Sequence, residues 1–182
     1  KLLLRNRVTV DARDFSGETP LLSACRNRQK AAQRLLIEQG ADVNARDKEG
    51  NTPLIWACQR DYFGELLGEP LLLIENGADV NAKTEQGKTP LHMACKSSWP
   101  RASGELVRVL IDNGADIHAQ DSEGSTPLHL AVIECYPSLV KLLIEKGANV
   151  DDRNREGDTP ESLAKKNGLQ ADHPVILALK EL

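Results

Sequence analysis

The dipeptide Thr-Pro recurs along this chain at a nearly constant interval. It begins at residues 19, 52, 89, 126 and 159, so the intervals are 33, 37, 37 and 33 residues. A tripeptide, Gly-Ala-Asp or Gly-Ala-Asn, begins at residues 40, 77, 114 and 147. Periods in this range indicate a solenoid, in which a single unit cannot bury its apolar face alone and stacks on its neighbours. The chain is therefore predicted to form a stack of units.

The stretch from residue 47 to 83 illustrates the local structure that each repeat predicts. Residues 47–51 (Asp-Lys-Glu-Gly-Asn) have the composition of a turn, with glycine where φ must be positive. Thr52 and Pro53 favour a helix start, because threonine is a good N-cap and proline suits the first helical position. A second helix is expected to end before Gly77, which is placed for a left-handed C-terminal cap.

These residues resemble the ankyrin repeat, whose pattern runs D-x-x-G-x-T-P-L-H-L-A-A, then a helix, then G-A-D-V-N-A. Residues 126–131 (Thr-Pro-Leu-His-Leu-Ala) are nearly the full motif, and residues 89–94 (Thr-Pro-Leu-His-Met-Ala) differ slightly. The resemblance covers essentially the whole chain. It implies an all-α ankyrin-repeat solenoid of stacked helix-turn-helix units with projecting β-turns.

On this resemblance, residues 1–182 form a single ankyrin repeat domain. Its expected parts are a truncated leading repeat (1–13), unit one (14–46), unit two (47–83), unit three (84–120), unit four (121–153) and a C-terminal capping repeat (154–182). In the capping repeat, Lys165 and Lys166 replace small core residues, and the second helix is expected to begin at residues 172–174.

Units two and three are each four residues longer than units one and four between Thr-Pro and the glycine cap. The surplus is predicted to lie between the paired helices, within residues 59–70 of unit two and residues 96–104 of unit three. Pro70 would interrupt a helix of ordinary length, so the second helix of unit two is predicted to begin near it.

Most of the few aromatic residues fall in or near these loops. Tyr62, Phe63 and Trp99 lie in the two long loops, Tyr136 lies in the corresponding loop of unit four, and Trp56 lies on the first helix of unit two, nearer the concave side. Tyr and Trp are enriched in binding hot spots, which favours a partner-binding edge. Burial of the rings against each other as a small satellite core is the alternative.

The resemblance also implies recognition through the turn tips and the inner face of the first helices. The residues predicted to contact a partner there are Phe15, Lys48, Glu49, Gln86, Lys88 and Glu123 on the turns, and Arg60 and Lys96 on the first helices. The family further suggests hydroxylation of Asn44 and Asn81, each within Asp-Val-Asn-Ala. An intact-mass measurement after coexpression with an asparaginyl hydroxylase would test that hypothesis.

Residues that could suggest catalysis or metal binding have structural interpretations. Cys25, Cys58 and Cys95 share one repeat position where ankyrin repeats place alanine, so core packing is predicted over a metal site. His92 and His129 belong to Thr-Pro-Leu-His, where the family uses histidine for hydrogen bonds within and between turns. No catalytic residues, cofactor or metal are predicted.

Composition narrows the class of partner. The chain carries a net charge of −4, which argues against a nucleic-acid surface. No apolar run approaches the ~20 residues needed to span a bilayer. Four cysteines without short spacings suit a reducing compartment, either cytosol or nucleus. Because the chain begins inside a repeat, an upstream segment is expected.

The function predicted from these features is a non-enzymatic protein–protein interaction module. It would recognise a protein or an extended peptide, as a monomeric domain of a larger intracellular protein and without membrane insertion. Two alternatives remain: a structural spacer, and the regulatory domain of an enzyme whose catalytic part lies elsewhere.

Overall fold

A computed structural model describes residues 9–59, 67–96 and 100–180, with the side chains of residues 100–103 outside the description. Within these ranges the chain forms ten α-helices and no β-strand. The helices are α1 (Pro20–Arg26), α2 (Lys30–Glu38), α3 (Pro53–Cys58), α4 (Gly68–Glu75), α5 (Pro90–Cys95), α6 (Pro100–Asp112), α7 (Pro127–Ile133), α8 (Pro137–Glu145), α9 (Pro160–Lys166) and α10 (Pro174–Lys180).

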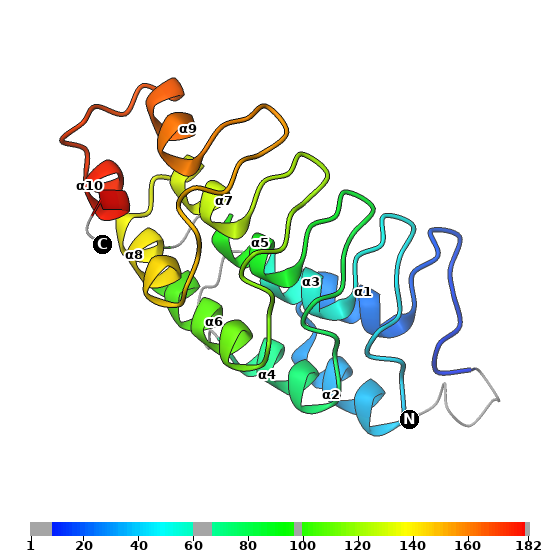
Figure 1. Ribbon diagram of the computed structural model, residues 1–182. Helices are drawn as coiled ribbons and strands as arrows, with labels where there is room; N and C mark the ends of the chain where they lie inside the picture. The colour runs from blue at the N-terminus through cyan, green and yellow to red at the C-terminus, as the bar shows by residue number, and fades with distance from the viewer. Residues whose placement is uncertain (1–8, 60–66, 97–99, 181–182) are drawn as a thin grey trace.

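The helices lie in two rows, and long turns project beside one of them (Figure 1). The first helices of the units, α1, α3, α5, α7 and α9, form the row next to the turns, and each contacts the next along the row. The second helices, α2, α4, α6, α8 and α10, form the other row. Helices α1 and α9, from the first and last units, lie at opposite ends of the first-helix row. This arrangement confirms the all-α solenoid predicted from the repeat.

Each first helix begins at the proline of a Thr-Pro pair, as predicted. Thr52 has an extended backbone, and its hydroxyl oxygen accepts a hydrogen bond from the Ile55 N–H at 3.3 Å. Thr159 accepts one from the Ser162 N–H at 3.2 Å in the same way. The first turn of a helix has N–H groups without helical partners, so a side-chain acceptor followed by a proline suits this position.

The second helices end at the predicted glycine caps. Gly77 has a φ of +88°, and its N–H donates to the Ile74 carbonyl at 3.0 Å. The next N–H, that of Ala78, donates to the Leu73 carbonyl at 3.0 Å. These bonds satisfy the last carbonyls of α4 and turn the chain towards the next unit.

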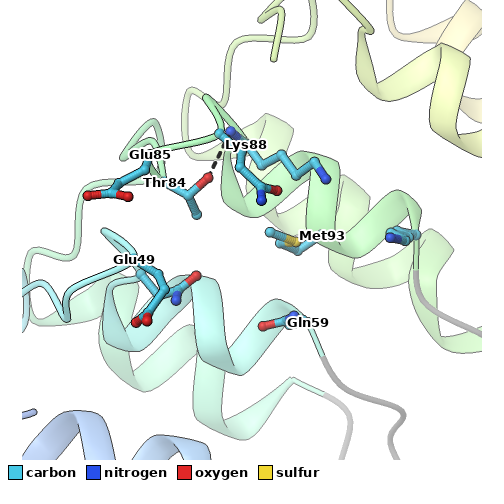
Figure 2. A pocket seen from close by; sticks show the side chains of 9 residues that line it. Glu49, Gln59, Thr84, Glu85, Lys88 and Met93 are labelled. Carbon is cyan, nitrogen blue, oxygen red and sulfur yellow. Dashed lines mark hydrogen bonds between the residues drawn. The ribbon is translucent and has the colours of Figure 1, made fainter. Parts of the chain in front are cut away.

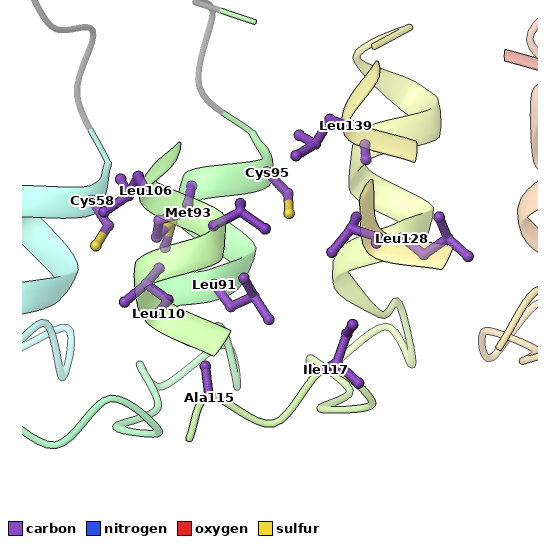
Figure 3. Close-up of a cluster of buried hydrophobic side chains, with 14 of the residues drawn as sticks. Cys58, Leu91, Met93, Cys95, Leu106, Leu110, Ala115, Ile117, Leu128 and Leu139 are labelled. Carbon is purple, nitrogen blue, oxygen red and sulfur yellow. The ribbon is translucent and has the colours of Figure 1, made fainter. Parts of the chain in front are cut away.

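The core is a continuous ribbon between the two rows. Leu21, Leu54, Leu91 and Leu128 occupy one repeat position, and none is more than 1% exposed. Figure 3 shows the same buried cluster in unit three and its neighbours.

The cysteines of the first three units belong to this ribbon, which confirms their predicted packing role. Cys25, Cys58 and Cys95 are buried, and burial raises the pKa of each thiol far above its ordinary value. They are therefore neutral and unreactive at physiological pH. Cys135, in the loop before α8, is exposed.

The extra residues of unit three do not all lie in a loop, contrary to the prediction. Helix α6 begins at Pro100 and has 13 residues, whereas α2 and α8 have 9 each. Residues 100–104, predicted as loop, are therefore helical. Pro100 can begin a helix because its missing N–H would have no helical acceptor at that position.

Unit two follows the prediction at its second helix. Helix α4 begins at Gly68, so Pro70 lies in its first turn, where a proline breaks no helical hydrogen bond. The rest of the long loop of unit two, residues 60–66, lies outside the described residues.

The last unit ends the stack with a polar first helix. Lys165 and Lys166 on α9 are exposed, and they pair with Glu161 and Asp158, respectively. Helix α10 begins at Pro174, as predicted for the capping repeat. A polar outer helix of this kind keeps the final apolar face of a solenoid from solvent.

Helix α4 carries a buried acid, Glu69, between units one and two. Glu69, in the first turn of α4, is only 5% exposed. Gln33 of α2 donates a hydrogen bond to its carboxylate, and donates another to the Ala24 carbonyl at 3.0 Å. The side chain also lies beside the buried Cys25 thiol. Burial raises the pKa of Glu69 above its ordinary value, although the bond from Gln33 opposes this change.

We expect the substitution Glu69→Gln to stabilise the domain at neutral pH by on the order of 1 kcal/mol. A glutamine keeps the acceptor for Gln33 without a buried charge. The raised pKa means that the folded state binds the proton more tightly than the unfolded state, so stability falls as pH rises from about 4.5 through the folded pKa. Urea unfolding at several pH values measures the effect. The gain should shrink towards pH 4.5, and the exposed Glu75→Gln on the same helix is the matched control.

Candidate partner-binding surface

The projecting turns are held in shape because a polar side chain at the start of each turn accepts a hydrogen bond from the backbone of the same turn. Asp47 Oδ1 accepts from the N–H groups of Glu49 at 3.0 Å and Asn51 at 2.8 Å. The other carboxylate oxygen of Asp47 accepts from Trp56 Nε1 at 3.0 Å. Asp121 makes the equivalent backbone bonds in unit four, to Glu123 and Ser125. The turn of unit two is therefore braced by the tryptophan of its own first helix.

From unit two onwards the tips are also tied to each other by backbone hydrogen bonds. The Glu85 N–H donates to the Glu49 carbonyl at 2.9 Å, the Ser122 N–H to Gln86 at 2.8 Å and the Arg155 N–H to Glu123 at 2.8 Å. The first tip differs, because a side chain makes the connection: Lys48 Nζ donates to the Phe15 carbonyl at 2.9 Å. The tips of units two to four and of the capping repeat thus form one pre-organised edge.

A pocket of about 420 Å³ lies between units two and three, where the turns meet the first helices (Figure 2). Its lining residues are Glu49, Asn51, Gln59, Thr84, Glu85, Gln86, Lys88, Met93 and Lys96. Met93, on α5, contributes the apolar part of the wall and is 8% exposed. The lining is otherwise polar or charged, which suits a segment of protein better than an apolar small molecule.

Four of the lining side chains carry charge and are available to a partner. Glu49, Glu85 and Lys96 are exposed, and Lys88 is half-buried. Within the described part of the chain, none of the four forms an ion pair. Charged first-helix residues towards both ends of the stack are paired instead. Arg26 contacts Glu18 at 2.9 Å, and Lys166 contacts Asp158.

The structure brings four of the predicted contact residues together. Glu49, Gln86, Lys88 and Lys96 all line the pocket between units two and three. Phe15 lies apart, fully exposed at the first tip with 105% of its reference area accessible. Lys48 is engaged with that first tip, and Glu123 is exposed at the tip of unit four.

The predicted aromatic edge is only partly described. Arg60, Tyr62, Phe63 and Trp99 lie outside the described residues. Trp56 and Tyr136 are half-buried and pack against the core, so each has a structural contact of its own.

Of the five other lining residues, Asn51, Gln59 and Glu85 lie on the turn tips and first helices from which contact was predicted, whereas Thr84 and Met93 were not predicted as partner contacts. A signal for Met93 was present, because it occupies the same repeat position as Trp56, four residues after the threonine of Thr-Pro. Thr84 stands where units two and four have aspartate, and its hydroxyl accepts from the Lys88 N–H at 3.1 Å.

The two buried histidines link neighbouring units, as the resemblance implied. His92 Nδ1 accepts from the Thr89 N–H at 3.2 Å, so the ring proton lies on Nε2, which donates to the Ser125 carbonyl at 3.0 Å. His129 makes the same pair of bonds to Thr126 at 3.2 Å and to the Asp158 carbonyl at 3.1 Å. Burial lowers the pKa of both histidines, so both are neutral hydrogen-bonding groups at pH 7.

Asn44 and Asn81 make a second set of bonds between units. The Asn44 amide donates to the Gly77 carbonyl at 3.0 Å, and its oxygen accepts from the Asp79 N–H at 2.8 Å. Asn81 repeats the pattern one unit on, with Gly114 at 2.9 Å and Asp116 at 2.8 Å. Both side chains are therefore committed in the folded stack, and their hydroxylation stays a prediction.

Within the part of the chain that the structure describes, no three His, Cys, Asp or Glu side chains are grouped so that they could hold a metal ion. None of the described helices is both long and apolar enough to cross a membrane.

A family model of ankyrin repeats in three copies matches residues 1–67, 68–154 and 101–177. These matches extend over nearly the entire chain, and the protein belongs to the ankyrin repeat family. Ankyrin repeats are generally protein–protein interaction modules, and proteins built from them are typically non-enzymatic. No curated protein was found to match the chain.

Proposed function

We propose that this domain is a non-enzymatic recognition module that binds a protein or an extended peptide, with the pocket between units two and three at the centre of its contact surface. The observation that carries the proposal is the concentration, around that pocket, of charged side chains that form no ion pair with any described residue. Glu49, Glu85, Lys88 and Lys96 surround a volume of about 420 Å³ on tips held by backbone hydrogen bonds. A rigid surface loses little conformational freedom on binding, which favours affinity.

The two alternatives lead to different expectations. A structural spacer would need neither an open pocket nor charges without partners. A regulatory domain of an enzyme would still bind through such a surface, and its contact would be with the catalytic part of a longer chain. Binding through the pocket is therefore common to two of the three interpretations.

Affinity capture from cell lysate with mass-spectrometric identification tests the proposal. We expect a partner captured by the wild type to be recovered at least about tenfold less by Lys88→Ala/Lys96→Ala, since contacts at the centre of an interface dominate its affinity. The matched control is Glu38→Ala/Glu75→Ala, which removes exposed charges from the second helices. Circular dichroism should show that each variant is folded.

Other results of the capture experiment would place the contact surface elsewhere or argue against binding. A partner that is retained by the lysine variant and lost by Trp56→Ala/Trp99→Ala would place the contact at the aromatic edge. A partner retained by every variant would place it elsewhere on the turns, for example at Phe15. Absence of any specific partner would favour the structural spacer.

A further inference from the structure

The charges around the pocket are segregated by sign. Glu49 and Glu85 come from turn tips, whereas Lys96 directly follows the last residue of α5. Figure 2 shows the side chain of Lys88 extending towards the α5 side, over Met93 and away from both glutamates. The pocket therefore has an acidic end at the tips, a basic end at α5, and Met93 between them.

No ion pair among the described residues neutralises this polarity. The four side chains form no ion pair among the described residues, although they surround one pocket. Close charges of opposite sign that do not contact each other are available to a ligand carrying the reverse pattern. Complementary charges across an interface fix the orientation of a partner and exclude partners with the wrong pattern.

Hydrogen bonds of the backbone hold the segments that line the pocket in one arrangement, which favours a single orientation of a bound ligand. The Glu85 N–H donates to the Glu49 carbonyl at 2.9 Å, so the two acids are held on adjacent tips. Lys88 is placed by its own N–H, which donates to the Thr84 hydroxyl at 3.1 Å. The backbone segments that carry the acidic and basic side chains are therefore fixed relative to each other by the fold.

We propose that the pocket binds an extended peptide segment in which an apolar side chain lies between a basic and an acidic residue. The lysine or arginine of this segment contacts Glu49 and Glu85, the apolar side chain packs on Met93, and the aspartate or glutamate contacts Lys88 and Lys96. The proposal rests on the proposed recognition function and adds the chemistry of the partner and its orientation.

Selection from a phage-displayed library of random linear peptides tests this inference. The wild type should enrich peptides with the order base, apolar, acid in one chain direction. The variant Glu49→Lys/Glu85→Lys/Lys88→Glu/Lys96→Glu keeps the net charge and reverses the polarity of the pocket. It should enrich peptides with the opposite order in the same chain direction.

Fluorescence anisotropy on one selected peptide gives the magnitude. The reversed domain should bind the peptide selected by the wild type at least tenfold more weakly, about the effect of one good contact. The control Glu38→Lys/Glu75→Lys changes exposed charges on the second helices and should leave the affinity unchanged. The difference between the two domains should diminish as salt is added, because exposed charge pairs are screened.

Failure of this inference is distinguishable from failure of the proposed function. No enriched peptide, or the same enriched order from both domains, would overturn the inference. The recognition function would survive that result if capture of a folded protein still depended on Lys88 and Lys96. Loss of capture and of peptide selection together would overturn both.

Discussion

Replacement of Gly124 by alanine is expected to destabilise the domain by about 2–4 kcal/mol, combining left-handed backbone strain with a steric clash. Gly124 has a φ of +74°, in the left-handed region. A Cβ at this position would lie 2.8 Å from the Arg155 nitrogen and 3.2 Å from two backbone atoms of Asn154. That nitrogen belongs to the N–H that ties Arg155 to Glu123, so the backbone of the last turn would have to move and weaken the bond between tips.

The chain provides a matched control for this substitution. Gly157 occupies the same repeat position in the last unit, with a φ of +82°, but its added Cβ would meet nothing within 4 Å. Gly157→Ala should therefore cost only the left-handed strain, roughly 1–2 kcal/mol.

Urea unfolding of both glycine variants and the wild type separates the two contributions. The slope of each transition must also be compared, because partial unfolding at one end of a solenoid would change it. Equal destabilisation by Gly124→Ala and Gly157→Ala would contradict this prediction, since it would mean that the contact between tips adds nothing to the free energy of unfolding.

The substitution His92→Ala is expected to cost about 2–4 kcal/mol, from a cavity and two unpaired backbone groups. His92 is fully buried at 0% exposure and bonds the Thr89 N–H within its unit and the Ser125 carbonyl in the next. Alanine has no group that can replace the imidazole, so the Thr89 N–H and the Ser125 carbonyl lose their hydrogen-bond partner. The measurement is again urea unfolding, and His118→Ala, at an exposed imidazole, should change stability by less than about 0.5 kcal/mol.

The same histidine should contribute to acid sensitivity. Burial lowers the pKa of His92 and His129, so below about pH 6.5 the unfolded state binds more protons than the folded state. Stability is therefore fully present above pH 6.5 and is lost as pH falls through the folded pKa values. A proton on Nδ1 of His92 would also face the Thr89 N–H, which now donates to that atom.

The free energy of unfolding, measured from pH 8 down to pH 5, tests whether stability falls on acidification. The slope below pH 6.5 should be smaller in a His92→Ala background than in the wild type, because one of the two titrating groups is absent. An unchanged slope would show that other groups control acid stability. Glu69 has the opposite sign and gains stability on acidification, so Glu69→Gln should make the loss in acid more evident.

The features predicted well from the sequence are those that depend on few neighbouring residues. Thr52 and Pro53 specify a helix start through a hydrogen bond only three residues long, and Gly77 specifies a helix end through its own φ. The repeat then implies the stack, because identical units with one apolar face bury it only against each other. The all-α solenoid follows from this local information, and the resemblance to ankyrin repeats added the buried cysteines and the linking histidines.

The features missed or left open depend on distances between units. The sequence placed the surplus of unit three in a loop, whereas packing extends α6 to 13 residues. Glu69 looks like an ordinary first-turn acid in the sequence, and only the stacking of α4 on α2 buries it against Gln33. In the sequence, Met93 is one of several apolar residues of its motif. It becomes part of the pocket wall only because the turns of units two and three meet beside it.

The sequence by itself therefore determined the class of fold, the boundaries of most helices and the side of the stack on which polar turns and first helices meet. The tertiary structure decided which charges remain available there. Arg26 and Lys166 find acids within reach, and Lys88 and Lys96 find none among the described residues. The physical reason is range: a cap or a turn is a contact within a few residues, whereas an ion pair depends on the separation of side chains that the stacking of whole units sets.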